Sequence, residues 1–181
     1  MDDAHDGTAP RPRFAARFRD PQREAAERAE QETLDHCYAH GYDQGYFEPE
    51  KVAVNELQAF ARSALIAAGL TCGNDEPTFV LDVPDVADYS AWHEGATGII
   101  HLHPMLLNQD IILHELAHWC NPANGHDAQF CGTLVELWHV VFGWEAAYEL
   151  RNAFLDFEAN VDDTCHSLDL SSGRAPHNPR A

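Results

Sequence analysis

The stretch that determines how this chain folds is NQDIILHELAHWC, residues 108–120. Its apolar residues recur every three to four positions, as they do on the buried face of an amphipathic helix. Asn108 is a residue type that caps helix N-termini, and residues 121–125, NPANG, are a clear helix breaker. We therefore predict a helix over residues 109–120.

Two histidines of this helix, His114 and His118, are four residues apart. That spacing places both imidazoles on one face, one turn apart, where they can bind the same metal ion. Glu115 lies beside this face, close enough to act on a water molecule at the metal without being a ligand. The H-E-x-x-H pattern is that of zinc metalloproteases, so we predict His114 and His118 as zinc ligands and Glu115 as the catalytic base. The alternative is a pair of ordinary histidines on a partly buried helix face.

Catalytic zinc sites usually combine three protein ligands with a water molecule, so a third ligand is needed. His126 follows a tight proline- and glycine-containing loop, and its neutral imidazole suits zinc. Glu136, on the next predicted helix, could instead supply a carboxylate. Asp127 is a further candidate, although it is better explained as the cap of that helix. We favour His126 and keep the other two residues as alternatives.

The remaining chain has further helical patterns and three short strand-like segments. Asp20 resembles a cap for the first helix, and Gly41 and Gly69 are expected to end the first two helices. The further helices are expected over about 21–40, 49–68, 127–143 and 144–160, and the strands over 78–83, 89–93 and 98–103. We expect a small, mainly antiparallel sheet before the H-E-x-x-H helix, and an α+β fold dominated by helices.

Length and composition indicate one domain, expected over residues 20–161, with disordered arms at 1–19 and 162–181. The 11 basic and 30 acidic residues give a formal charge of -19, which disfavours binding to nucleic acid and to anionic membranes. Five scattered cysteines without a C-x-x-C pair exclude a disulfide framework and a zinc ribbon. Because the N-terminus is acidic and no apolar run could span a bilayer, we expect a cytoplasmic protein.

Residues 113–130, LHELAHWCNPANGHDAQF, and the following CGTLVELWHVVFG resemble the SprT-like and WLM zinc metallopeptidases. The resemblance is greatest to the actinobacterial and phage family of HExxH metallohydrolases, and it covers about residues 97–158. That family combines an H-E-x-A-H helix, a third histidine shortly before an aromatic residue, and an L-x-E-L helix. The resemblance implies a zincin-like α+β fold, with Glu115 as the general base. It also implies the zinc ligands His114, His118 and His126.

The chain departs from these relatives in two ways. Asp127 follows the third histidine where many members have glycine, and the zinc ribbon or basic segments of DNA-acting SprT-like proteins are missing. We therefore expect a zinc-dependent hydrolase acting on a peptide or protein, and do not carry over the DNA-repair role. The alternatives are a non-catalytic, metal-stabilised binding or regulatory module, and an SprT-like protease acting near nucleic acid. The latter is opposed by the acidic charge.

One further hypothesis concerns the strand predicted at 98–103. Its alternation places His101 and His103 on one face. In zincin-like folds the corresponding strand borders the cleft and can pair with an extended peptide. These histidines could therefore contact substrate, or they could be polar residues on the exposed side of an edge strand.

Overall fold

A computed structural model describes most of the predicted domain, over residues 20, 22–44, 49–70, 76–83, 91–94, 97–122 and 125–162. The arms expected at 1–19 and 162–181 lie outside these residues, apart from Asp162. The described elements are α1 (Arg23–Gln44), a 3-10 turn (Val54–Glu56), α2 (Leu57–Ala67), β1 (Thr78–Leu81), β2 (Ala91–Glu94), β3 (Ile99–Leu102), α3 (Gln109–Cys120), α4 (Ala128–Phe142) and α5 (Trp144–Asp156). The expected helix-dominated α+β class is confirmed.

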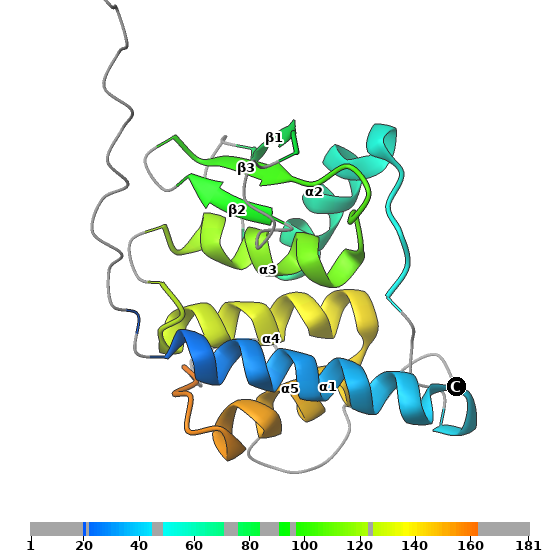
Figure 1. The fold of residues 1–181 in the computed structure, drawn as a ribbon, viewed down its shortest axis with the longest axis vertical. Helices are drawn as coiled ribbons and strands as arrows, with labels where there is room; N and C mark the ends of the chain where they lie inside the picture. Colours follow the sequence, from blue (N-terminus) through cyan, green and yellow to red (C-terminus); the bar gives the residue numbers. More distant parts are fainter. Residues whose placement is uncertain are drawn as a thin grey trace, which may run out of the picture.

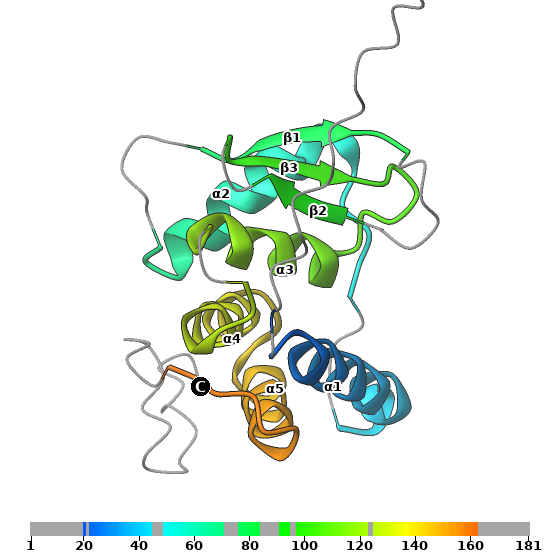
Figure 2. The ribbon, with the colours of Figure 1, turned by 60° about the vertical axis from the view of Figure 1, so that its left-hand side comes forward.

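The elements form layers around α3 (Figures 1 and 2). The sheet lies on one side of α3, and α4 lies on its other side, with α1 and α5 beyond. α2 contacts α3 and α4, and it lies behind the strands in the view of Figure 2. None of the described helices has the length and apolar character needed to cross a membrane.

The sheet has the order β1-β3-β2 and is mixed. β2 pairs antiparallel with β3, as expected for neighbours joined by the short turn at Gly98, whose φ is +70°. β1, however, pairs parallel with β3, so the expectation of a mainly antiparallel sheet is wrong. The physical reason is that β2 lies between β1 and β3 in sequence, so no hairpin turn makes these two strands antiparallel. β1 instead pairs with the free side of β3, whose Ile100 and Leu102 are buried.

The helix predicted over 109–120 is confirmed as α3. Its apolar residues form a fully buried face, made by Ile112, Leu113, Leu116 and Ala117. Asn108 occupies the N-cap position, but its side chain makes no capping bond, contrary to expectation. The backbone of Asn108 instead pairs with Lys51, so this position is fixed by the neighbouring segment.

The segment around Lys51 differs from the helix predicted there. A helix was expected from residue 49, but α2 begins only at Leu57. The chain before it runs extended beside the residues preceding α3, where Val52 N donates to Leu107 O (2.8 Å) and Gln109 N to Glu50 O (3.0 Å). Pairing with this segment therefore outweighs the helical pattern over residues 49–53.

The remaining helix ends follow from backbone geometry. Gly69 ends α2 as predicted, with φ +68° and a Leu70 N to Leu65 O bond of 2.9 Å. Gly41 does not end α1, which continues to Gln44, because an interior glycine costs a helix only about 1 kcal/mol. α5 stops at Asp156, four residues earlier than expected, because Glu158 adopts a left-handed conformation with φ 62°.

Candidate metal centre

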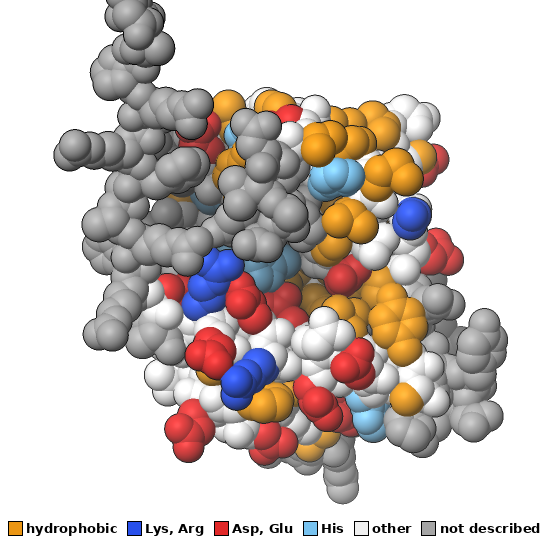
Figure 3. All heavy atoms as spheres, viewed as in Figure 1, with side chains coloured by type: hydrophobic (Ala, Val, Ile, Leu, Met, Phe, Trp, Pro, Cys, Tyr) orange, Lys and Arg blue, Asp and Glu red, His pale blue; other side chains and the backbone are white. Residues whose placement is uncertain are grey.

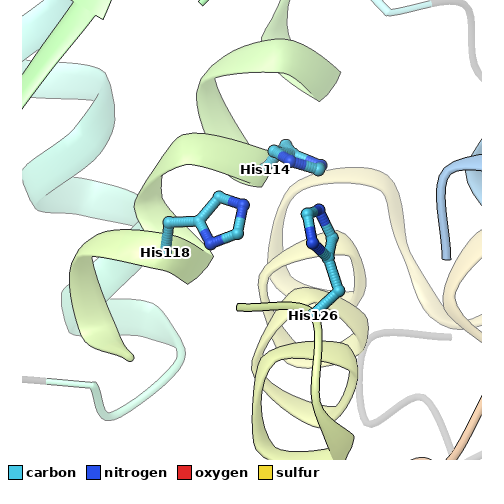
Figure 4. A group of neighbouring side chains, drawn as sticks. All are labelled: His114, His118 and His126. Atoms are coloured by element: carbon cyan, nitrogen blue, oxygen red, sulfur yellow. The ribbon is translucent and has the colours of Figure 1, made fainter. Parts of the chain in front are cut away.

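The three predicted ligand histidines meet at one point between α3 and α4. Their candidate ligand nitrogens all lie within 4.8 Å of one another. Figure 4 shows the rings pointing together, His114 and His118 from α3 and His126 from the turn before α4. The ring centroids are separated by 4.9 Å (His114–His118), 5.2 Å (His114–His126) and 4.6 Å (His118–His126). This group could hold a metal ion.

Local structure explains why the third histidine reaches α3. Gly125 has φ +63°, a left-handed conformation that glycine adopts without strain, and it turns the chain back toward the helix. Asp127 then begins α4, because its Oδ1 accepts bonds from Gln129 N (3.1 Å) and Phe130 N (3.0 Å). The cap predicted at Asp127 is confirmed. His126 is held between these two fixed points.

Phe130 closes one side of the group. Its ring centroid lies 5.1 Å from that of His114, 4.4 Å from that of His118 and 4.6 Å from that of His126. The phenyl ring is fully buried in the core. It fixes the imidazole planes by packing and keeps bulk water from this side of the site.

Two carboxylates hold two of the imidazoles from the side opposite their meeting point. His114 Nδ1 lies 2.8 and 3.0 Å from the two carboxylate oxygens of Glu30. His126 Nδ1 lies 2.6 Å from Asp20 Oδ2, which also accepts from the His126 backbone N–H at 2.9 Å. Because an ionised carboxylate only accepts hydrogen bonds, each Nδ1 donates, and in the neutral, metal-binding form of each ring this leaves the lone pair on Nε2.

The second ring nitrogen of His126, Nε2, indicates whether the three histidines suit a metal ion. His126 Nε2 is buried and has no hydrogen-bond partner among the described residues. A buried polar atom without a partner is unfavourable by about 1–3 kcal/mol, so a ligand for it is expected. A metal ion bound by neutral imidazole nitrogens would supply that partner. The donor set therefore fits a metal.

The protonation of the three histidines differs. Burial alone would lower the pKa of His114, but the charge and hydrogen bond of Glu30 outweigh it and raise this pKa to about 9. Burial and repulsion by the neighbouring histidines lower the pKa of His118 to about 2. Burial likewise lowers the pKa of His126. His118 and His126 are therefore neutral, the form in which imidazole binds metals.

Glu115 has the features of a group that handles protons. It is 5% exposed, and its Oε2 has no hydrogen-bond partner among the described residues. Burial raises its pKa to about 7, despite the opposing effect of His114. A general base acts best when its pKa is near the working pH, so this carboxylate can take up and release a proton near neutrality.

The other candidates do not join the group in the part of the chain that the structure describes. Glu136 is buried on α4, and Asp127 is used as the helix cap. Neither residue belongs to the group formed by the three histidines, so His126 remains the favoured third ligand.

The histidines of the predicted strand also lie elsewhere. β3 is central, so its expected position at the sheet edge is wrong. His101 bonds Asp82 Oδ2 at 3.1 Å and stacks on Trp92 with centroids 4.3 Å apart. His103 Nδ1 accepts from Met105 N at 3.2 Å. Neither histidine belongs to the metal-binding group.

Sequence reasoning missed three residues near the site. It assigned Asp20 only to capping, a role it also fills toward Gln22 N at 3.1 Å, and it gave Glu30 no role. His93 likewise has no role assigned from the sequence. It pairs with Ile100 and so faces α3, and its Nε2 is buried without a partner among the described residues. All three residues reach the site through contacts with residues distant in sequence, and the spacing of residues along the chain does not predict such contacts.

No protein-family model, curated protein or solved structure matches this chain. The family named from the sequence resemblance therefore stays a prediction, and function has to be argued from the residues of the site.

Proposed function

We propose that this protein is a zinc-dependent hydrolase with a zincin-like fold, and that its substrate is a peptide or protein. One observation carries the proposal: three imidazoles converge on a helix that also bears Glu115, next to His114 in the chain. Glu115 is buried, and its Oε2 has no hydrogen-bond partner among the described residues. The α3 helix that bears the motif lies directly against a small sheet, which supports the zincin-like fold.

Zinc is the metal that this donor set suits best. Imidazole nitrogens are among its preferred ligands, and three protein ligands are the usual number in catalytic zinc sites. Among the described residues, His114, His118 and His126 form a group of that size. The set leaves a coordination position for water or substrate, which supports a catalytic site over a closed structural one.

The proposed chemistry divides between metal and protein. A zinc ion in such a site acts as a Lewis acid and lowers the pKa of water. Glu115 accepts the proton from the attacking water at its unpaired carboxylate oxygen and later passes it to the leaving amine. Glu30 and Asp20 hold the two imidazoles in orientation, and Phe130 excludes water from one side.

An extended peptide has a natural place in this fold. β2 is an edge of the sheet as described, with β3 as its partner there, and it lies against α3. The unpaired backbone groups of an edge strand can bind a peptide as an additional strand. His93 points from β2 toward α3, so such a peptide would run beside the metal centre.

The test uses the full chain purified with zinc. We expect about one zinc per chain by elemental analysis and cleavage of a peptide library. Glu115→Gln should keep its zinc and lose about 10²–10⁴-fold in the cleavage rate, the contribution of a positioned general base. Glu32→Gln, the same change at an exposed position of α1, serves as the matched control and should leave both quantities unchanged.

Two results would count against the proposal. If Glu115→Gln cleaved peptides as fast as the unaltered protein, the role given to Glu115 would be wrong. If the zinc-loaded protein cleaved no peptide, the site would be a non-catalytic module that zinc stabilises.

A further inference from the structure

Two acidic residues reach the metal centre from positions distant from the ligands in sequence: Asp20, just before helix α1, and Glu30, on α1. Glu30 is separated from His114 by 84 positions, and Asp20 from His126 by 106. Both carboxylates are mostly shielded, with side-chain exposures of 14% for Glu30 and 18% for Asp20. Charged side chains cover the surface over α1 in Figure 3, whereas these two carboxylates are mostly shielded and bonded to the histidines.

Asp20 bonds both the ring and the backbone of His126, whereas Glu30 bonds only the ring of His114. One oxygen, Oδ2, accepts from both the ring Nδ1 and the backbone N–H of His126. The close approach of Asp20 depends on Gly125, because a Cβ there would lie 2.8 Å from the same oxygen. Backbone and ring of His126 are therefore fixed together by one carboxylate.

We propose that Asp20 and Glu30 form a carboxylate clamp, which positions two of the three imidazoles so that their Nε2 atoms bind zinc. A metal-binding histidine commonly donates its second ring N–H to a carboxylate, which fixes the tautomer and makes the ligand more basic. The clamp rests on the metal site proposed above. By linkage, zinc binding in turn strengthens the docking of α1 on the rest of the protein.

The clamp is not what attaches α1 to the fold. Small buried side chains of α1, Ala26 and Ala29, belong to the core, and α1 packs along α5. Asn160 N donates to Gln22 Oε1 at 2.8 Å, which adds a tie at the start of the helix. Neutralising the clamp should therefore leave the fold intact and act on the metal.

The test compares Asp20→Asn and Glu30→Gln with Glu32→Gln, an exposed position of the same helix. Asparagine caps helices as well as aspartate does, so Asp20→Asn keeps the start of α1. Zinc affinity is measured by competition with a chromophoric chelator. We expect each clamp variant to bind zinc about 10–100-fold more weakly, and Glu32→Gln to bind it like the unaltered protein.

A second readout separates positioning from mere stability. Long-range proton–nitrogen NMR spectra of the zinc-loaded protein should show the proton of His114 and of His126 on Nδ1. Circular dichroism of the metal-free variants should match that of the unaltered protein. A proton on Nε2 of either histidine, or clamp variants that bind zinc as tightly as Glu32→Gln, would overturn the clamp.

The clamp and the proposed hydrolase activity can fail separately. If the clamp variants bind zinc more weakly and no form of the protein cleaves peptides, the clamp is supported and the hydrolase proposal is wrong. If peptide cleavage depends on Glu115 but both clamp variants keep full zinc affinity, the hydrolase proposal is supported and the clamp is wrong. A protein that binds no zinc would overturn both.

Discussion

Gly125→Ala should weaken zinc binding without an unusual loss of stability. Gly125 has φ +63°, and a Cβ at this position would lie 2.8 Å from Asp20 Oδ2 and 3.1 Å from Asp20 Cγ. The contact is with the end of a side chain, which can move away. The carboxylate that moves is the one bonded to His126 at 2.6 Å, so the substitution displaces the support of a ligand.

Gly69 provides a matched control for the backbone effect. Its φ is +68°, nearly that of Gly125, but a Cβ there meets nothing within 4 Å. A left-handed alanine costs about 1–2 kcal/mol at either position. At about 2–4 °C per kcal/mol, both variants should lose roughly 2–8 °C in melting temperature. Only Gly125→Ala should also lose zinc affinity, by about 10-fold or more.

The assay is chelator competition for zinc together with thermal melting of the metal-free proteins. The two variants should agree in melting temperature and differ in zinc affinity. Equal zinc affinities for Gly125→Ala and Gly69→Ala would show that the Asp20 carboxylate does not govern His126.

Three further predictions concern the core, the metal and the thiols. Leu150→Ala, at a fully buried position of α5, should destabilise the protein by about 2–5 kcal/mol in denaturant unfolding. Leu155→Ala on the same helix, at a side chain that is 49% exposed, should cost much less, and equal losses would contradict the packing described. Zinc at about 1,000 times its Kd should stabilise the fold by about 4 kcal/mol, so EDTA should lower the melting temperature, but not in His118→Ala. Because burial raises the thiol pKa of Cys37 to about 11 and of Cys131 to about 12, both should resist iodoacetamide at about pH 8 until urea unfolds the chain, as peptide mass mapping would show.

Local sequence signals predicted how His114, His118 and His126 come together. The apolar spacing and the breaker at 121–125 placed α3, and the i,i+4 relation then placed His114 and His118 on one face. Asp127 was expected to cap α4 and does so. The short loop between these helices was enough to expect His126 beside them. All these features depend on contacts between residues close in sequence.

The support for the site could not be predicted in this way. Asp20 and Glu30 meet their histidines only after α1 packs along α5, and an acidic helix offers many equivalent glutamates. The parallel pairing of β1 with β3 depends similarly on which strand becomes central. In each case several residues or strands distant in sequence could form the contact, and hydrophobic periodicity does not predict which of them does.

The polar groups left without partners argue that this cluster is more than an accident of packing. A fold selected for stability alone would not leave His126 Nε2 and Glu115 Oε2 buried and unpaired, since each is unfavourable by about 1–3 kcal/mol. The same structure supplies each neighbouring Nδ1 of His114 and His126 with a carboxylate. Among the described residues, the Nδ1 atoms of His114 and His126 thus have partners, whereas Nε2 of His126 and Oε2 of Glu115 have none. That asymmetry is expected of a site whose remaining partners are a metal ion and a reacting water.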